Sequence, residues 1–134
     1  MRNIKFCSLK KKVKLLIYKW RNSKLVNKFL LKKKINYSEH NEWFSKKLNN
    51  KDSLAWIITF NKHKIGLAQI NKIKEKTCNA GFYIINRKYS YLTFLVINLL
   101  HYKIFYEYDY KAIQSYINVK NNKIRKLNKM CGYI

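Results

Sequence analysis

The sequence predicts a single α/β domain, in which a mixed, mostly antiparallel sheet of about five strands carries helices on both faces. Three observations predict this class. Short segments with alternating apolar residues are typical of strands, and three of them follow one another around polar turns. Segments with apolar residues three or four positions apart are typical of helices and separate the other strands. Neither a repeat nor a linker interrupts the pattern, so residues 1–134 are expected to form one domain.

The N-terminal segment predicts one strand and two helices. Arg2–Leu9 has the composition of a first strand. The apolar residues that follow have helical spacing: Val13, Leu16, Ile17 and Trp20. This helix ends near Trp20-Arg21-Asn22, where Asn22 or Ser23 can close it and cap a second helix over Lys24–Leu31.

A third helix is predicted from its start signal. Asn36 and Glu39 have the spacing of a capping box, with Ser38 as an alternative cap. The helix extends to about Leu48 because helical spacing continues that far. It places four side chains on one side: His40, Trp43, Phe44 and Lys47.

Three strands then form an antiparallel meander. They are Leu54–Phe60, Lys64–Asn71 and Thr77–Ile85. The turns between them are Asn61-Lys62-His63 and Lys72–Lys76, and both are short enough for hairpins. In the third strand, alternate residues face opposite sides: Cys78, Ala80, Phe82 and Ile84 on one, and Asn79, Gly81, Tyr83 and Ile85 on the other.

The helix after this meander predicts a phosphate site. Leu92–Tyr106 is apolar nearly all round, so it should be buried against the sheet. The loop Asn86–Tyr91 leads into it. A helix start leaves its first N–H groups unpaired, and Arg87 and Lys88 add positive charge there. The alternative is an ordinary crossover from strand to helix.

A fifth strand and a last helix complete the predicted fold. Ala112–Val119 has the apolar pattern of a strand and follows the polar turn Glu107–Lys111. Asn121 or Asn122 can cap the last helix, and Gly132 ends it.

Composition excludes several classes of protein. Hydrophobic residues make up 48% of the sequence, which is too many for a disordered chain. No apolar run is long enough to span a membrane, and the lysine-rich Met1–Lys14 lacks the apolar core of a signal peptide. The 3 cysteines are widely spaced, which argues against a disulfide framework or a metal site. We therefore expect a cytoplasmic protein that needs no metal.

The net charge of +24 predicts affinity for polyanions, including a phosphorylated cofactor or a nucleotide-linked substrate. Part of this charge reflects an A/T-rich genome, because Lys, Asn, Ile, Tyr and Phe abound while Pro is absent. A small basic nucleic-acid-binding protein is a distant alternative. Nucleic acid is not the expected partner, because no basic helix with interleaved aromatic residues belongs to a recognised module.

Four motifs occur in the order and spacing of one enzyme superfamily. They are Trp20-Arg21-Asn22; Ile35 with Glu39-His40 and Trp43-Phe44; Gly81-Phe82-Tyr83-Ile84; and Asn121-x-x-Ile124-x-x-Leu127 followed by Gly132-Tyr133. With these motifs and this element order, nearly the whole chain resembles the GNAT acyltransferase superfamily. It most resembles amino-sugar N-acetyltransferases of the pseudaminic-acid (flagellin-sugar) pathway. Ribosomal-protein acetyltransferases share several of the same features.

The resemblance implies direct acetyl transfer from acetyl-CoA to an amine, without a covalent intermediate. Backbone groups of Phe82, Tyr83 and Ile84 would hold the pantetheine arm, and one of their N–H groups would stabilise the oxyanion. The side chains that would bind the rest of the cofactor are Arg87, Lys88, Ser90, Thr93 and Asn121.

The resemblance also implies a small-molecule amine as acceptor, such as a UDP-linked amino sugar. Five residues from the ends of the first and third helices would line its site: Trp20, Arg21, Asn22, His40 and Trp43. Arg21 would pair with a diphosphate, and neutral His40 would donate a further hydrogen bond. Packing in the core is the alternative role for Trp20 and His40. Tyr83 and Tyr116 are expected to pack with their hydroxyls hydrogen-bonded.

Three departures from the family pattern affect these expectations. The loop Asn86–Thr93 has no glycine, so phosphate binding would depend on side chains. Asn128 stands where many members carry a tyrosine that acts as general acid, so no catalytic acid or base is identified. The sixth and seventh strands have no counterpart, which would expose the fifth strand unless a partner, such as a second copy, covers it. The alternatives are an impaired remnant that binds CoA, and a ribosomal-protein or peptide N-acetyltransferase.

Overall fold

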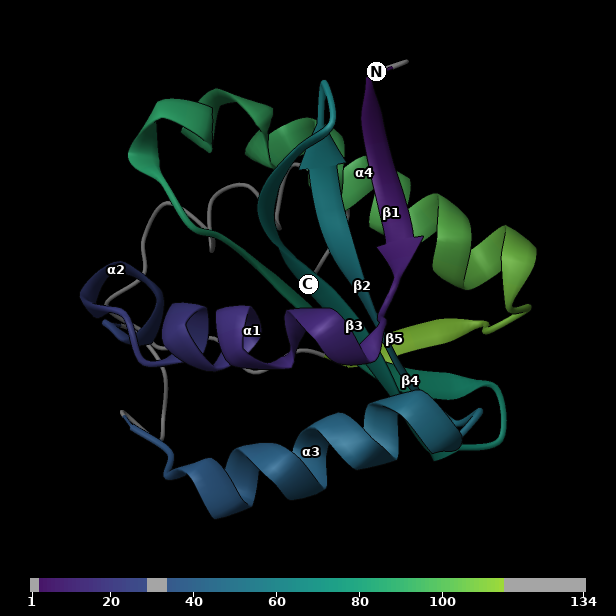
Figure 1. Cartoon of the computed structure of the whole chain (residues 1–134). Helices are drawn as coiled ribbons and strands as arrows, with labels where there is room; N and C mark the ends of the chain where they lie inside the picture. Colours follow the sequence, from purple (N-terminus) through teal and green to yellow (C-terminus); the bar gives the residue numbers. More distant parts are fainter. Residues whose placement is uncertain (1–2, 29–33, 115–134) are drawn as a thin grey trace.

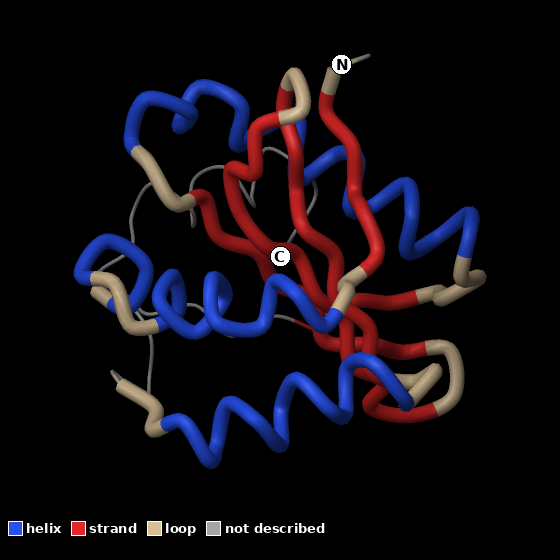
Figure 2. The backbone as a smooth tube through the Cα atoms, in the orientation of Figure 1, coloured by secondary structure: helices blue, strands red, loops and turns tan. Residues whose placement is uncertain are grey.

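A computed structural model describes residues 3–28 and 34–114 of the chain (Figure 1). One five-stranded sheet forms the middle layer, and helices cover both of its faces (Figure 2). The strands are β1 (Ile4–Ser8), β2 (Ser53–Phe60), β3 (His63–Lys74), β4 (Thr77–Ile84) and β5 (Ala112–Gln114). The α-helices are α1 (Lys14–Arg21), α2 (Lys24–Asn27), α3 (Tyr37–Asn49) and α4 (Thr93–Tyr102). The predicted fold class is confirmed.

The strands lie in the order β1-β2-β3-β4-β5. All neighbouring strands are antiparallel except β4 and β5, which are parallel over Thr77–Asn79 and Ala112–Gln114. A parallel pair needs a long crossover, and α4 with its flanking turns supplies it. The rest of the predicted strand Ala112–Val119 lies outside the described residues, as does the predicted last helix with Asn121 and Asn128.

Both turns of the meander are shorter than predicted. Asn61 and Lys62 alone join β2 to β3, and their φ angles of 49° and 70° are those of a two-residue hairpin turn. His63, predicted in the turn, already belongs to β3. At the other end, β3 continues to Lys74 because a bulge after Lys72 keeps it paired with β4.

A hydrophobic cluster lies on each face of the sheet. Under α4, the cluster is built around Ile58, Ile65, Ala68, Val96, Leu100 and Ile104. Under α1 and α3, it is built around Val13, Ile17, Trp20, Phe44, Ile57 and Leu67. Each fully buried aliphatic side chain contributes roughly 1.5–3 kcal/mol to stability. The strand β4 contributes to both clusters, with Phe82 toward α4 and Tyr83 toward α1, as its alternation predicted.

Local signals start the N-terminal helices as predicted. The Asn36 side chain accepts the backbone N–H of Glu39 at 2.8 Å, and the Glu39 carboxylate accepts that of Asn36 at 3.3 Å. This capping box begins α3. The Ser23 hydroxyl accepts the N–H of Val26 and begins α2. The structure describes α2 as far as Asn27, and the rest of the predicted second helix falls largely on residues that are not described.

The predicted helix Leu92–Tyr106 consists of three helical segments. A 3-10 helix, η2 (Arg87–Leu92), precedes α4, and a π-helical turn, η3 (Lys103–Glu107), follows it. The predicted loop Asn86–Tyr91 is therefore wrong over most of its length. In the residues that the structure describes, no helix is both long and apolar enough to cross a membrane.

Candidate active site

The end of α1 lies over the face of β4 that carries Tyr83. Trp20, in the last turn of α1, is 8% exposed and packs in the same cluster as Tyr83. Trp20 is therefore a core residue, the alternative that the sequence had left open. Its position fixes Arg21, the last residue of the helix, beside the strand.

The turn that follows β4 is held by hydrogen bonds that were not predicted from the sequence. The Asn86 side chain accepts the N–H of Lys88 at 3.0 Å, and the Asn86 carbonyl accepts that of Tyr89 at 3.0 Å. These two N–H groups are thus paired within the chain, whereas the expected phosphate site assumed unpaired ones. The turn still presents two positive charges to a ligand, because the side chains of Arg87 and Lys88 are exposed.

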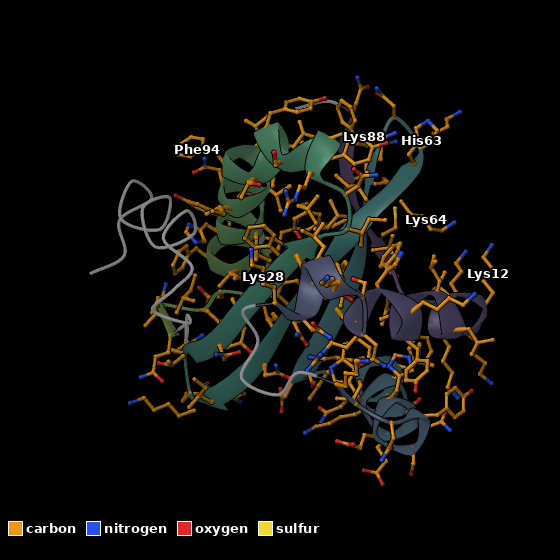
Figure 3. All side chains as sticks on the ribbon, turned by 90° about the vertical axis from the view of Figure 1, so that its left-hand side faces the viewer. Lys12, Lys28, His63, Lys64, Lys88 and Phe94 are labelled. Carbon is orange, nitrogen blue, oxygen red and sulfur yellow. The ribbon has the colours of Figure 1, made fainter. Side chains whose placement is uncertain are left out.

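Aromatic contacts hold this turn against the tip of the β2–β3 hairpin. The Lys88 ammonium lies 5.1 Å from the centre of the Tyr89 ring. That ring meets Phe60 edge-on, with 6.3 Å between the ring centres. Lys88 and His63 consequently lie on the same side of the molecule (Figure 3).

Thr93, a predicted phosphate ligand, has a structural partner. Its side chain is 5% exposed, and its hydroxyl donates to the Ser90 carbonyl at 2.8 Å. This bond joins η2 to α4. Ser90 is half-buried in the same turn.

Two residues predicted to line the acceptor site form hydrogen bonds that hold the helices together. The Asn22 amide donates to the Ile35 carbonyl and accepts the Ile35 N–H, each at 3.0 Å. His40 is 1% exposed, and its Nε2 lies 2.8 Å from the Lys14 carbonyl. Burial lowers the pKa of His40, so the neutral ring donates to that carbonyl. The structure gives His40 its packing role and ties Asn22 to the start of α3.

Arg21 and Tyr83 approach each other beside the end of α1. Burial lowers the pKa of Arg21, and nearby Tyr83 and Glu39 oppose this effect. Burial also raises the pKa of Tyr83, with Arg21 opposing it. The Tyr83 hydroxyl is buried, and no described residue forms a hydrogen bond with it. The prediction of a hydrogen-bonded hydroxyl is therefore wrong.

Open space lies over β4 next to Tyr83. A Cβ atom built on Gly81 would meet no atom of the described residues within 4 Å. Gln69 lies opposite Gly81 in β3, and its Oε1 accepts a hydrogen bond from Trp43 Nε1 at 3.3 Å. Trp43 was predicted from the sequence, whereas Gln69 and the space over Gly81 were not. A glycine within a strand is the signal that could have indicated it.

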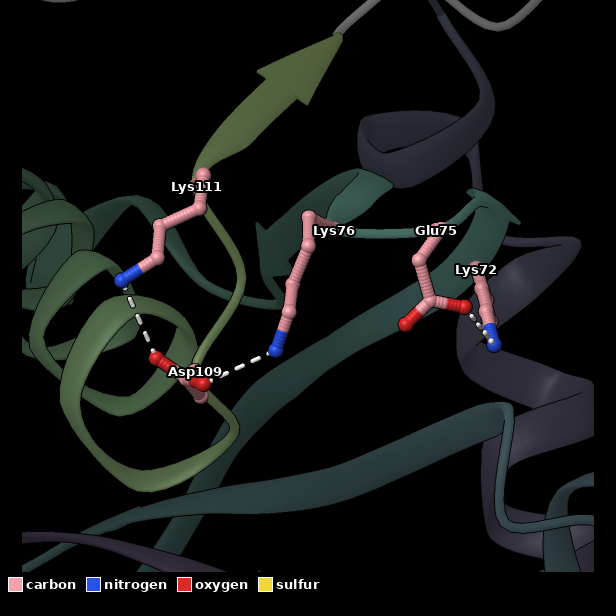
Figure 4. Close-up of polar contacts among 5 residues, drawn as sticks. All are labelled: Lys72, Glu75, Lys76, Asp109 and Lys111. Atoms are coloured by element: carbon pink, nitrogen blue, oxygen red, sulfur yellow. Dashed lines mark hydrogen bonds and ion pairs between the residues drawn. The ribbon is translucent and has the colours of Figure 1, made fainter.

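The charged groups differ between the two ends of β4. Where β4 begins, Lys72 pairs with Glu75 at 3.5 Å, and Asp109 pairs with Lys76 at 2.8 Å and with Lys111 at 3.2 Å (Figure 4). Where β4 ends, four basic side chains form no ion pair within the described residues: Lys62, Lys64, Arg87 and Lys88. We call these four residues the basic end.

The described residues offer no cluster of three or more His, Cys, Asp or Glu side chains that could hold a metal ion. The geometry instead combines the strand β4, a cationic turn after it and a space on one face of that strand. Such an arrangement can bind an anionic cofactor beside the strand and a second molecule over the strand's face.

Comparison with known proteins shows which family the sequence matches. The profile of the acetyltransferase (GNAT) domain matches residues 10–134. The acetyltransferase PseH of Campylobacter jejuni is 29% identical over 113 residues, covering 84% of this chain and 71% of PseH.

Solved structures share the fold. Spermidine N-acetyltransferase from Vibrio cholerae, in complex with CoA and spermine, matches with a TM-score of 0.87 and 16% identity, over 100% of this chain and 82% of that one. Campylobacter jejuni PseH, in complex with acetyl coenzyme A, matches with a TM-score of 0.75 and 19% identity, over 98% and 88%.

Proposed function

The chain belongs to the GNAT acetyltransferase family, and we propose that its acceptor is a small amine that also carries an anionic group, such as a nucleotide-linked amino sugar. The enzyme is an acetyl-CoA-dependent N-acetyltransferase. The observation that carries the proposal about the acceptor is that Arg21 and Tyr83 are near enough to influence each other's pKa over β4, because both present hydrogen-bond donors and Arg21 adds a positive charge.

The proposed cofactor site uses the end of β4 and the turn after it. Acetyl-CoA carries phosphates, and the exposed side chains of Arg87 and Lys88 are cations that no described carboxylate neutralises. The pantetheine arm would lie along the backbone of Phe82–Ile84. An N–H group there would stabilise the oxyanion that forms when the amine attacks the thioester.

The carboxylates of the chain argue against a polyamine acceptor. The chain has 6 Asp and Glu residues, and all of them lie within the described part. Among these carboxylates, only Glu39 influences the pKa of Arg21. Its carboxylate already accepts the Asn36 N–H of the capping box. A polycation such as spermine would therefore meet Arg21 with little negative charge to offset it. An anionic acceptor would be attracted.

A protein that binds acetyl-CoA without transferring the acetyl group is the second candidate. The specific observation is that Asn86 pairs the N–H groups of Lys88 and Tyr89, which an open phosphate loop would leave for the ligand. A ribosomal-protein or peptide amine is the remaining alternative acceptor.

We also propose that the enzyme is cytoplasmic and that a second copy of the chain covers the outer edge of β5.

Release of free CoA, measured with a thiol reagent, tests the proposal. We expect turnover with a UDP-linked amino sugar and little with spermidine. Replacing Arg21→Ala should raise the KM for the sugar nucleotide about tenfold, because a charge-assisted contact is lost, and should leave the KM for acetyl-CoA unchanged.

Two controls make this test specific. Lys19→Ala removes one positive charge from the exposed side of the same helix and should change neither KM. UDP should compete with the sugar nucleotide and not with acetyl-CoA. Absence of competition at millimolar UDP would rule out a UDP-linked acceptor, and turnover with a peptide amine would then point to the alternative.

A further inference from the structure

The Tyr83 hydroxyl is a buried polar group that makes no hydrogen bond within the described residues. Such a group loses its bonds to water on folding and gains nothing in return, which is destabilising. Native structures contain few such groups, and each one needs an explanation. Tyr83 lies near the end of β4, on the face of the sheet under α1.

The neighbours of this hydroxyl indicate what it lacks. Tyr83 remains protonated at neutral pH, so its O–H is a donor. Arg21, which influences its charge, has donors only. The partner that the Tyr83 hydroxyl lacks is therefore a hydrogen-bond acceptor, and the positive charge of Arg21 nearby favours an oxygen with negative charge.

The space over Gly81 gives the Tyr83 ring room to move. Gly81 and Tyr83 are two positions apart on β4 and face the same side, and in the part of the chain that the structure describes no atom lies within 4 Å of the Cβ position at Gly81. Tyr83 as a whole residue is partly buried, and its hydroxyl is fully buried. A rotation of the ring toward Gly81 would break no hydrogen bond of the hydroxyl.

We propose that Tyr83 is a further acceptor-binding residue, whose hydroxyl swings toward the space over Gly81 and donates a hydrogen bond to an anionic oxygen of the acceptor. The inference rests on the proposed function, because it concerns the same acceptor site. Tyr83 would bind the oxygen together with Arg21. The space over Gly81 would hold the part of the acceptor next to that oxygen.

Tyr83→Phe tests this proposal, because it removes only the hydroxyl. We expect the KM for the UDP-linked amino sugar to rise at least about tenfold, the effect of one lost hydrogen bond to a charged group. The KM for acetyl-CoA should not change. The melting temperature without ligand should stay the same or rise, because the buried hydroxyl had no partner.

Two further variants complete the design. Tyr110→Phe removes a hydroxyl from another partly buried tyrosine that packs on the opposite face of the sheet, and it should leave both KM values unchanged. Gly81→Val fills the space over β4 with a side chain that suits a strand. It should raise the acceptor KM at least about tenfold while the protein remains folded.

The outcomes separate this inference from the proposed function. Turnover by the wild type with the UDP-linked amino sugar tests the function alone. If the wild type is active and Tyr83→Phe leaves the acceptor KM unchanged, the role of Tyr83 is wrong. A fall in melting temperature of several degrees for Tyr83→Phe would equally overturn it, because the hydroxyl would then have a structural partner. An equal rise of the KM for acetyl-CoA would assign Tyr83 to the cofactor instead.

Discussion

Lys47 is a buried cation without a carboxylate. It is 5% exposed, and its Nζ donates to the Leu54 carbonyl at 3.3 Å, the Ile70 carbonyl at 3.2 Å and Asn71 Oδ1 at 2.8 Å. These bonds join α3 to one end of β2 and β3. Burial lowers the pKa of Lys47 to about 8, because desolvation penalises the charged form. The sequence placed Lys47 on the inner side of α3 but gave no sign of its three partners.

The stability that depends on Lys47 should therefore vary with pH. In the unfolded chain its pKa is 10.5, so between about pH 8 and 10.5 the unfolded state binds more protons. The contribution of Lys47 to the free energy of unfolding rises over this interval and is constant below it. Lys47→Met should cost about 2 kcal/mol at pH 7, because three acceptors lose their donor.

Urea unfolding at several pH values measures this difference. The gap between the wild type and Lys47→Met should widen from pH 8 to pH 10. The exposed Lys51 gives a matched control, because it does not act on the pKa of Lys47, and Lys51→Met should show no such trend. A gap that stays constant with pH would mean that Lys47 has an ordinary pKa in the folded protein.

At the scale of the elements, β3 and β4 approach closely at Gly66. A Cβ atom there would collide with the Tyr83 carbonyl oxygen and lie 3.2 Å from Ile84 Cα. The irregular pairing of β2 and β3 between Ile58 and Thr59 lies beside this contact. Gly66 thus allows β3 to support the backbone segment that is proposed to hold the pantetheine arm.

Two glycine substitutions should have opposite consequences. Gly66→Ala should lower the free energy of unfolding by about 3 kcal/mol, because backbone atoms of β4 would have to move. Gly81→Ala meets no atom, and alanine loses less entropy on folding, so stability should stay equal or rise. Chemical denaturation of both variants measures the contrast. Equal stabilities would show that the two strands can separate at Gly66 without penalty.

At the scale of the whole molecule, charge is distributed unevenly along β4. The ion pairs around Glu75 and Asp109 lie where the strand begins, and the basic end lies where it finishes. The net charge of +24 leaves most lysines without a carboxylate. Acetyl-CoA, as an anion, should be attracted to the basic end, and the attraction should weaken as salt screens it.

The affinity for acetyl-CoA should consequently depend on salt. We expect the dissociation constant to increase as the ionic strength rises from about 0.05 to 0.5 M. Replacing both Arg87→Ala and Lys88→Ala should weaken binding at least about tenfold and reduce the salt dependence. Isothermal titration measures both effects. The exposed pair Lys51→Ala and Lys74→Ala, at the other end of the sheet, is the control. Unchanged affinity in the Arg87 and Lys88 variant would place the phosphates elsewhere.

Local patterns were sufficient to predict most elements. The capping box at Asn36, the stripe of Ile17 and Trp20, and the alternation of β4 all appear in the structure. These features depend on residues a few positions apart, which a sequence displays directly. The prediction failed at the turn after Asn86, where a side-chain cap favours a 3-10 helix over an open loop.

The sequence by itself determined the order of the elements, the faces of the strands and, through its motifs, the resemblance to one family. Only the tertiary structure decided the roles of individual polar side chains. Asn22 and His40 were predicted to meet the acceptor, and in the structure they form hydrogen bonds with backbone groups 13 and 26 residues away. The Tyr83 hydroxyl was expected to be bonded, and it has no partner in the described residues. Periodicity shows which way a side chain points, but a hydrogen bond depends on the distance between atoms that only packing brings together.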